Sequence, residues 1–273
     1  MIVRTLVEDT KTATGLGSEH GLSLHIETNG YKILFDVGAS DLFLRNANEM
    51  NVSVSDVDYL VISHGHYDHG GGLRAFLKTN TKAKVFIHQL AFEKYYAQRL
   101  DSLDYIGLDE ELKQNKQIVL ISGLFSVNEN LRLFANTTQR NLRLKSNSSL
   151  FMEQDGQIIE DVFNHEQNLI IKEDGKTVLI TGCAHNGIIN ILKEFNDLQS
   201  SMPDYVIGGF HLSSRSSGGN ESFETIDRIG QFLTEAKAMY YTGHCTGIGP
   251  YRRLKSILGT RIEYLSTGSK IVI

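Results

Sequence analysis

One short stretch of the chain concentrates side chains that could bind metal ions. Residues 61–73 read V-I-S-H-G-H-Y-D-H-G-G-G-L, and His64, His66, Asp68 and His69 fall within six positions of it. Alternate side chains of an extended segment point the same way, so His64 and His66 can reach one ion. Asp68 and His69 are adjacent and project differently, which suits a second ion. Imidazole and carboxylate groups bind zinc, and also iron or manganese.

The alternative for this stretch is a polar surface loop that happens to be rich in histidine. The chain holds 10 histidines among 273 residues, so three of them within six positions beside an aspartate are unusual. The glycines at 65 and 70–72 allow close backbone approaches that a Cβ would prevent. The sequence therefore favours a metal-binding loop at the end of a buried strand, predicted at 57–62.

Three further histidines stand where other predicted strands end. His185 follows the second run of a hairpin centred on Asp174-Gly175, a dipeptide typical of tight hairpin turns. His211 follows the short apolar run 205–207, and His244 follows the run 238–241. This repeated placement predicts that the rest of the chain brings additional ligands to the first loop.

The remaining elements follow from apolar periodicity and turn residues. Strands are predicted at 2–7, 22–28, 32–35, 84–87, 117–121, 131–134, 262–265 and 271–273, and helices at 41–50, 73–78, 91–99, 190–198, 223–236 and 250–258. The region of about 101–160 has weak signals and is expected to be a variable segment that influences substrate choice. The polar loop 213–222 is either a lid or a linker. The loop carrying Glu19 and His20 either reaches the site or stays on the surface.

Composition narrows the class of protein. Hydrophobic residues make up 41% and charged residues 22%, with a net charge of −5, which is ordinary for a globular protein. No basic patch indicates a nucleic-acid partner, and no apolar run is long enough to cross a membrane. Cys183 and Cys245 are the two cysteines and are expected to be free thiols in a reducing compartment. The expected protein is cytoplasmic, acts on a small molecule, and has an undetermined oligomeric state.

The segment H-G-H-Y-D-H resembles the H-x-H-x-D-H signature of the metallo-β-lactamase fold superfamily. This resemblance implies an α+β fold, a four-layer αββα sandwich formed by a single domain over 1–273, with the site at the edge of two sheets. Four motifs in order, G-H-Y-D-H-G-G-G-L, T-G-C-A-H-N-G-I-I-N-I-L, G-G-F-H-L and G-H-C-T-G, are similar to one branch. That branch is named for 7,8-dihydropterin-6-yl-methyl-4-(β-D-ribofuranosyl)aminobenzene-5′-phosphate synthase.

The resemblance also implies a set of ligands for two divalent ions. His185 would join His64 and His66 on one ion, and His244 would join Asp68 and His69 on the other. Asp36, in F-D-V-G, matches an aspartate that supports the metal site by fixing a ligand histidine through its other ring nitrogen. The alternative for Asp36 is a turn that precedes a helix.

His211 departs from the pattern of the superfamily, which places a bridging aspartate near this point. A neutral imidazole cannot bridge two ions as a carboxylate does, so His211 either ligates one ion or contacts substrate. Asp204 precedes the strand at 205–207, so it should lie at the end of the strand away from the site, where it could not bridge two ions. Cys245 is a possible extra ligand, although its side chain should diverge from that of His244.

The function these features imply is metal-dependent hydrolysis, in which a metal-activated hydroxide attacks a phosphoester-containing, pterin- or nucleotide-like small molecule. Asp68 and His211 are the candidate catalytic residues, and two ions, zinc as first choice with iron or manganese as alternatives, are the expected cofactors. A lactone or thioester hydrolase and a non-catalytic, metal-loaded metabolite sensor remain open. A di-iron oxidoreductase is disfavoured, because such members carry a glutamate where this chain has His66.

Overall fold

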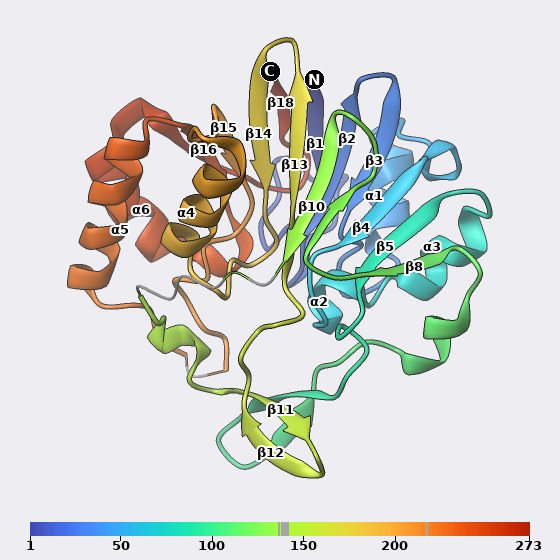
Figure 1. Cartoon of the computed structure of the whole chain (residues 1–273), viewed down its shortest axis with the longest axis horizontal. Coiled ribbons are helices and arrows are strands. Elements are labelled where there is room, and N and C mark those ends of the chain that lie inside the picture. The colour runs from blue at the N-terminus through green and yellow to red at the C-terminus, as the bar shows by residue number, and fades with distance from the viewer. Residues whose placement is uncertain (136, 138–141, 217) are drawn as a thin grey trace.

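The structure of the protein is a computed structural model that describes residues 1–135, 137, 142–216 and 218–273. Within them, two sheets of seven strands face each other (Figure 1). The first sheet has the order β18 (Lys270–Val272), β1 (Ile2–Val7), β2 (Ser23–Thr28), β3 (Tyr31–Phe35), β4 (Tyr59–Ile62), β5 (Lys84–His88) and β8 (Ile118–Ile121). The second has the order β17 (Ile262–Tyr264), β16 (Met239–Thr242), β15 (Tyr205–Ile207), β14 (Lys176–Ile180), β13 (Gln167–Glu173), β10 (Leu131–Ala135) and β9 (Leu124–Ser126).

Parallel strands are what bring the functional loops together. In the first sheet β3, β4 and β5 run parallel, and in the second β14, β15, β16 and β17 do. Parallel neighbours end at the same edge of a sheet, so the loops that follow them are adjacent. The loops after β3, β4, β14, β15 and β16 carry the histidines and aspartates singled out above.

Helices cover the outer face of each large sheet, as Figure 1 shows for the red-orange and blue halves of the molecule. The helices are α1 (Leu42–Glu49), α2 (Tyr67–Gly70), α3 (Leu73–Thr79), α4 (Ile188–Gln199), α5 (Phe223–Ala236) and α6 (Ile248–Leu258). Phe43 and Phe76 pack between the first sheet and its helices, and Phe195 and Leu233 between the second sheet and its helices. A third cluster, which includes Ile180, fills the space between the sheets. The predicted four-layer αββα sandwich is therefore confirmed.

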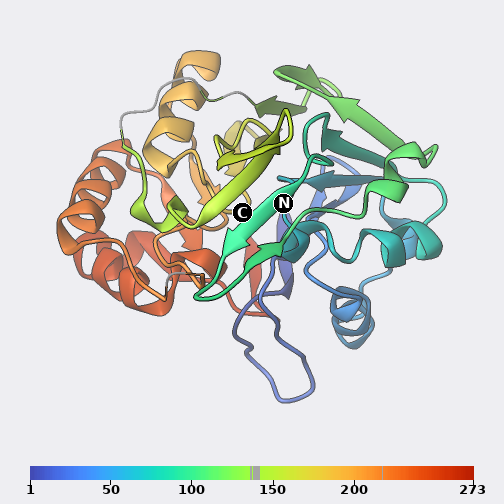
Figure 2. The same cartoon turned by 90° about the horizontal axis from the view of Figure 1, so that it is seen from below.

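A sheet of four strands lies apart from the sandwich, at the bottom of Figure 1, and its face is seen in Figure 2. Its order is β12 (Gln157–Glu160), β11 (Leu150–Gln154), β6 (Tyr95–Gln98) and β7 (Leu103–Tyr105). The predicted helix at 91–99 is wrong, because this stretch contributes β6. Tyr95 and Ala97 are buried while Gln98 is exposed, which is the period of two expected for a strand.

Several predicted elements agree with the structure at both ends, namely β1, β15 and α5. Most of the region 101–160 is structured, although residues 136 and 138–141 lie outside the described part. None of the described helices is both long enough and apolar enough to cross a membrane.

Candidate metal centre

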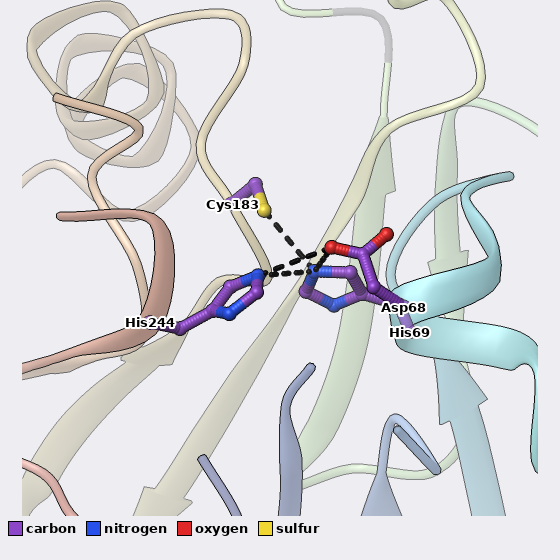
Figure 3. Close-up of side chains that lie close together, drawn as sticks. All are labelled: Asp68, His69, Cys183 and His244. Atoms are coloured by element: carbon purple, nitrogen blue, oxygen red, sulfur yellow. Dashed lines mark hydrogen bonds and ion pairs between the residues drawn. The ribbon is translucent and has the colours of Figure 1, made fainter. Parts of the chain in front are cut away.

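Four buried side chains converge at the edge of the two large sheets (Figure 3). The Nε2 atoms of His69 and His244 are 3.2 Å apart. Asp68 Oδ2 lies 3.3 Å from His244 Nε2 and 3.7 Å from His69 Nε2. The Sγ atom of Cys183 lies 3.1 Å from His69 Nε2. Nitrogen, oxygen and sulfur donors this close together suit a divalent metal ion such as zinc.

A second group lies beside the first. His64 Nε2 is 3.3 Å from His185 Nε2, and Cys183 lies within reach of both. The ring of His66 packs 4.6 Å from that of His64 and 5.0 Å from that of His185, measured between centroids. The structure therefore brings together all three histidines predicted for one ion, and the three residues predicted for the other.

The backbone at these strand ends is unusually constrained. Gly182 packs so closely against Ser63 that a Cβ at position 182 would collide with the serine hydroxyl. Ala184, His211 and His244 have positive φ angles of 59°, 47° and 50°. Side chains with a Cβ seldom adopt such angles, and strained positions of this kind cluster at functional sites.

Oxygen atoms hold the far nitrogen of most candidate ligand rings. Asp36 Oδ2 lies 2.6 Å from His69 Nδ1. Asp36 therefore contacts the far ring nitrogen of a candidate ligand histidine. The other contacts join Ser63 Oγ to His64 Nδ1 at 2.8 Å, Asn147 Oδ1 to His185 Nδ1 at 3.0 Å, and Asp9 Oδ1 to His244 Nδ1 at 2.7 Å. An acceptor on Nδ1 fixes the proton there and leaves the Nε2 lone pair for a metal.

His66 is held from a different direction. Its Nε2 atom lies 3.7 Å from Asp161 Oδ2, without a hydrogen-bond partner. Asp161 in turn contacts His165 Nε2 at 3.1 Å, and His165 Nδ1 accepts the backbone N–H of Gly65 at 2.9 Å. Among the described residues, the donor atom of His66 groups with those of Asp161 and His165.

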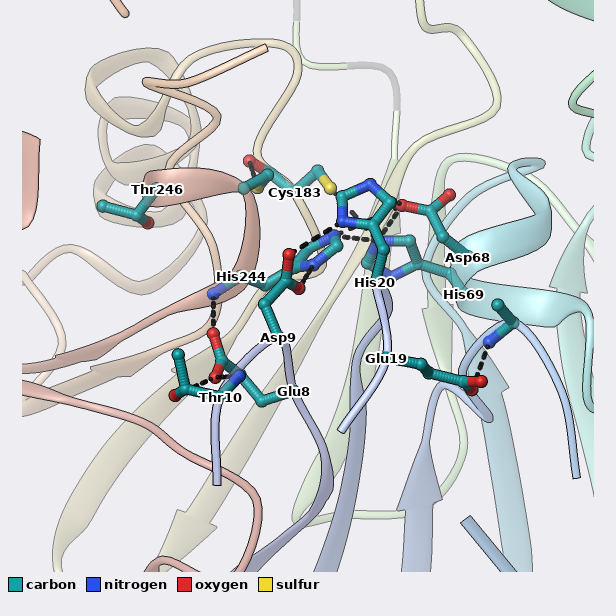
Figure 4. Close-up of polar contacts among 12 residues, drawn as sticks. Glu8, Asp9, Thr10, Glu19, His20, Asp68, His69, Cys183, His244 and Thr246 are labelled. Atoms are coloured by element: carbon teal, nitrogen blue, oxygen red, sulfur yellow. Dashed lines mark hydrogen bonds and ion pairs between the residues drawn. The ribbon is translucent and has the colours of Figure 1, made fainter. Parts of the chain in front are cut away.

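The loop before β2 reaches the site (Figure 4). His20 Nδ1 lies 2.9 Å from Asp9 Oδ2, and its Nε2 lies 3.4 Å from Asp68 Oδ2. Glu19 instead fixes the loop, since its carboxylate accepts the backbone N–H groups of Ala39 and Ser40. Of the two alternatives for this loop, contact with the site is the one the structure shows.

His211 lies next to His185, with ring centroids 4.1 Å apart. It is 8% exposed, and its two ring nitrogens have no hydrogen-bond partner among the residues that the structure describes. Cys183, His211 and Cys245 form a further group of donors. Buried nitrogens without partners are costly, so these orphaned atoms indicate that the site is built to receive a further group. Asp204 is at the opposite end of β15, where it accepts the backbone N–H of Thr177.

Burial and charge set the protonation of the site. Burial lowers the pKa of His64 and of His185 well below the ordinary histidine value, which keeps both neutral near pH 7. Burial acts to raise the pKa of Asp68, but His69 and His244 outweigh it and hold that pKa well below its usual range. Burial acts to lower the pKa of His244, but Asp9 and Asp68 raise it well above 6.5. The carboxylates therefore stabilise positive charge where the four donors meet.

Several functional residues were not found from the sequence. Cys183 was interpreted only as a free thiol, although its spacing to His185 repeats the alternate spacing of His64 and His66. Asp9, Asn147 and Asp161 belong to segments distant in the chain, and no local pattern marks them. Both cysteines are free, as predicted.

A pocket lies beside the two groups of donor side chains. Its base includes His66, Asp68, Cys183, His185 and His211. Its walls carry apolar side chains from and beside the four-stranded sheet together with two arginines; these are Ala97, Ile106, Leu150, Arg99 and Arg215. Arg99 Nη1 donates to Ser216 Oγ at 3.0 Å, which ties the loop at 213–222 to the wall, although position 217 lies outside the described residues.

Comparison with known proteins agrees with this architecture. The chain is 30% identical over 262 residues to the uncharacterized protein MJ0448 of Methanocaldococcus jannaschii, covering 94% of each. It is 28% identical to 7,8-dihydropterin-6-methyl-4-(beta-D-ribofuranosyl)-aminobenzene-5′-phosphate synthase of the same organism, over 84% of this chain and 82% of that protein. The crystal structure of Tm1679, a metal-dependent hydrolase of the beta-lactamase superfamily, matches with a TM-score of 0.84 at 29% identity, over 100% of this chain and 99% of that one. The model of the metallo-beta-lactamase superfamily matches residues 17–235, and the chain belongs to this superfamily.

Proposed function

We propose that the protein hydrolyses a small, anionic phosphoester with the help of two zinc ions. Membership of the superfamily supports a metal-dependent hydrolase. The observation that carries the finer proposal is the pair of converging donor groups at the base of a pocket whose wall bears two arginines. One ion would be held by His64, His66 and His185, and the other by Asp68, His69 and His244.

Ions bound at these positions supply Lewis acidity, which lowers the pKa of water and neutralises developing charge. Asp68 is placed to handle the proton of the attacking water. One of its carboxylate oxygens points toward His69 and His244, while the other points away from them (Figure 3). Because the pKa of Asp68 lies well below its usual range, the carboxylate is ionised and can accept a hydrogen bond from that water.

His211 is the second catalytic candidate. Its two ring nitrogens lack partners, and its backbone is fixed because its carbonyl oxygen accepts Ser146 Oγ at 2.5 Å. A fixed imidazole on the pocket wall can donate a hydrogen bond to a substrate oxygen or protonate a leaving group. This role takes up the alternative in which His211 contacts substrate.

The pocket wall supports an anionic substrate. Arg99, which also pairs with Asp104 at 3.4 Å, and Arg215 line the pocket, and the guanidinium fork suits phosphate oxygens. Apolar Ala97, Ile106 and Leu150 would face the less polar part of the same molecule. A relative of this chain is named as a 5′-phosphate synthase, which agrees with this chemistry.

The test is an activity screen of the zinc-loaded protein over phosphomonoesters, phosphodiesters, lactones and thioesters. We expect turnover of a phosphoester that is lost in His64→Ala. In Arg99→Gln we expect KM for that substrate to rise roughly tenfold, the equivalent of about 1.4 kcal/mol, with kcat less affected. Arg253→Gln is the matched control, since Arg253 pairs with Asp227 on the surface. Tight binding without turnover would reject hydrolysis, and turnover confined to uncharged lactones or thioesters would reject the phosphoester.

A further inference from the structure

We propose that Cys183 is a sulfur ligand of the ion that Asp68, His69 and His244 would hold. The inference rests on the metal-dependent function proposed above and adds a ligand that the H-x-H-x-D-H signature does not contain. Among the described residues, Cys183 is common to the group with Asp68 and His69, to the group with His64 and His185, and to the group with His211 and Cys245.

The geometry matches a tetrahedral site. In the group of Asp68, His69, Cys183 and His244, the measured separations between donor atoms are 3.1, 3.2, 3.3 and 3.7 Å. Zinc bonds of about 2.0 to 2.3 Å in a tetrahedron place neighbouring donors about 3.3 to 3.7 Å apart. The sulfur of Cys183 points toward His69 in Figure 3, and the four donor atoms all lie within 4.8 Å of one another.

The backbone holds the sulfur in this place. Gly182 packs against Ser63, and its carbonyl oxygen accepts the N–H of Gly209 at 2.7 Å. Ala184 has a φ of +59°, which turns the chain between Cys183 and His185. Cys183 is 2% exposed and lines the pocket, so its thiol is buried at the site. The thiol of Cys183 is thus held in one group with the imidazoles of His69 and His244, which come from the two halves of the sandwich. This placement suits a metal ligand.

Charge balance supports a thiolate ligand. Asp68 contributes the carboxylate of the four-donor group, and the exit of β15 bears His211, which has no carboxylate, where an aspartate is usual in the superfamily. A divalent ion with Asp68 as its anionic ligand would keep a net positive charge in a buried place, which is costly. A Cys183 thiolate removes that charge, and sulfur is a favourable zinc ligand.

Cys245 provides the matched control. It is also buried, its Sγ donates to the carbonyl oxygen of Cys183 at 3.5 Å, and it packs beneath Gly209. It groups with Cys183 and His211, and not with Asp68. Replacing either cysteine by serine changes the volume equally little, so the two variants separate ligation from packing.

The experiment loads the full chain with cobalt(II) and records its absorption spectrum. We expect a thiolate-to-cobalt charge-transfer band in the parent and in Cys245→Ser, and loss of that band in Cys183→Ser. Zinc affinity of Cys183→Ser should fall on the order of 100-fold, because changing a mere supporting partner of a ligand already costs about 10- to 100-fold. X-ray absorption of the zinc-loaded parent should show a sulfur shell at about 2.3 Å. Circular dichroism reports whether each variant is folded.

The outcomes separate this inference from the proposed function. Cobalt uptake without a sulfur band in the parent, or a band that persists in Cys183→Ser, overturns ligation by Cys183 and leaves the metal-dependent function standing. A band that disappears only in Cys245→Ser also overturns it. No uptake of metal by the folded parent overturns both.

Discussion

Replacing Asp36 by asparagine tests whether the carboxylate behind His69 controls metal binding. Asp36 is fully buried, and its Oδ1 accepts the backbone N–H of Ser63 at 2.7 Å. Its Oδ2 lies 2.6 Å from His69 Nδ1 and accepts Ser63 Oγ at 2.7 Å. Asparagine preserves the volume, and it tolerates the positive φ of 60° at this position. The substitution therefore changes hydrogen bonding with little other disturbance.

An asparagine must place its NH2 group against one of two N–H donors. The backbone N–H of Ser63 cannot change its character, so we expect the amide oxygen to stay there and the NH2 group to face His69. His69 must then accept at Nδ1 and carry its proton on Nε2, the atom that faces Asp68 and His244. Loss of such a supporting contact lowers metal affinity about 10- to 100-fold, or about 1.4 to 2.7 kcal/mol.

The assay is competition for zinc against a chelator of known affinity, with circular dichroism to verify folding. Asp155→Asn is the control, because Asp155 also has a positive φ, of 52°, but lies in an exposed turn. The zinc affinity of the site that contains His69 should fall in Asp36→Asn and stay constant in Asp155→Asn. Equal zinc affinities in a folded Asp36→Asn and its parent would refute the tautomer argument.

Three further predictions concern acid stability, backbone fit and metal content. Burial lowers the pKa of His25 to about 4, whereas its pKa in the unfolded chain is about 6.5. The free energy of unfolding therefore falls as the pH falls from about 6.5 to 4. Between pH 7 and pH 5, the free energy of unfolding of His25→Leu should fall by about 2 kcal/mol less than that of the parent, as measured by urea titration. Gly208→Ala would press a Cβ into a backbone carbonyl and should lower the free energy of unfolding by more than 2 kcal/mol, whereas Gly123→Ala, with open space around it, should cost about 1 kcal/mol; equal costs would contradict the clash. His244→Ala should retain about one zinc per chain and His64→Ala should disturb the other ion, as measured by elemental analysis; unchanged metal content in both would reject the two-ion proposal.

The resemblance of H-G-H-Y-D-H to a known signature predicted the sandwich, and short apolar runs bounded by turn residues predicted most of its strands. Strand β15 and helix α5 were placed correctly at both ends. The loop with His64 and Asp68 was recognisable because all its donors lie within six positions. His185 and His244 could be added because each follows a buried strand, and parallel strands end at a common edge.

Contacts between distant segments could not be predicted in this way. Asp9 and His244 are 235 positions apart, and only the folded chain places them 2.7 Å from each other. The segment 91–99, which contains Tyr95 and Tyr96, was predicted to be a helix. Its pairing with β11 outweighed that local preference, since strand formation depends strongly on packing context.

The contact between Asp9 and His244 has a consequence for how the protein matures. Asp9 and Asp68 are synthesised early, but the imidazole that they share arrives only when nearly all of the chain has emerged from the ribosome. Contacts with such large sequence separation form slowly, so a nascent chain has no complete pocket in which to capture a cation tightly. We therefore expect metal to bind after folding, and a misfolded chain to be distinguishable by its failure to retain metal.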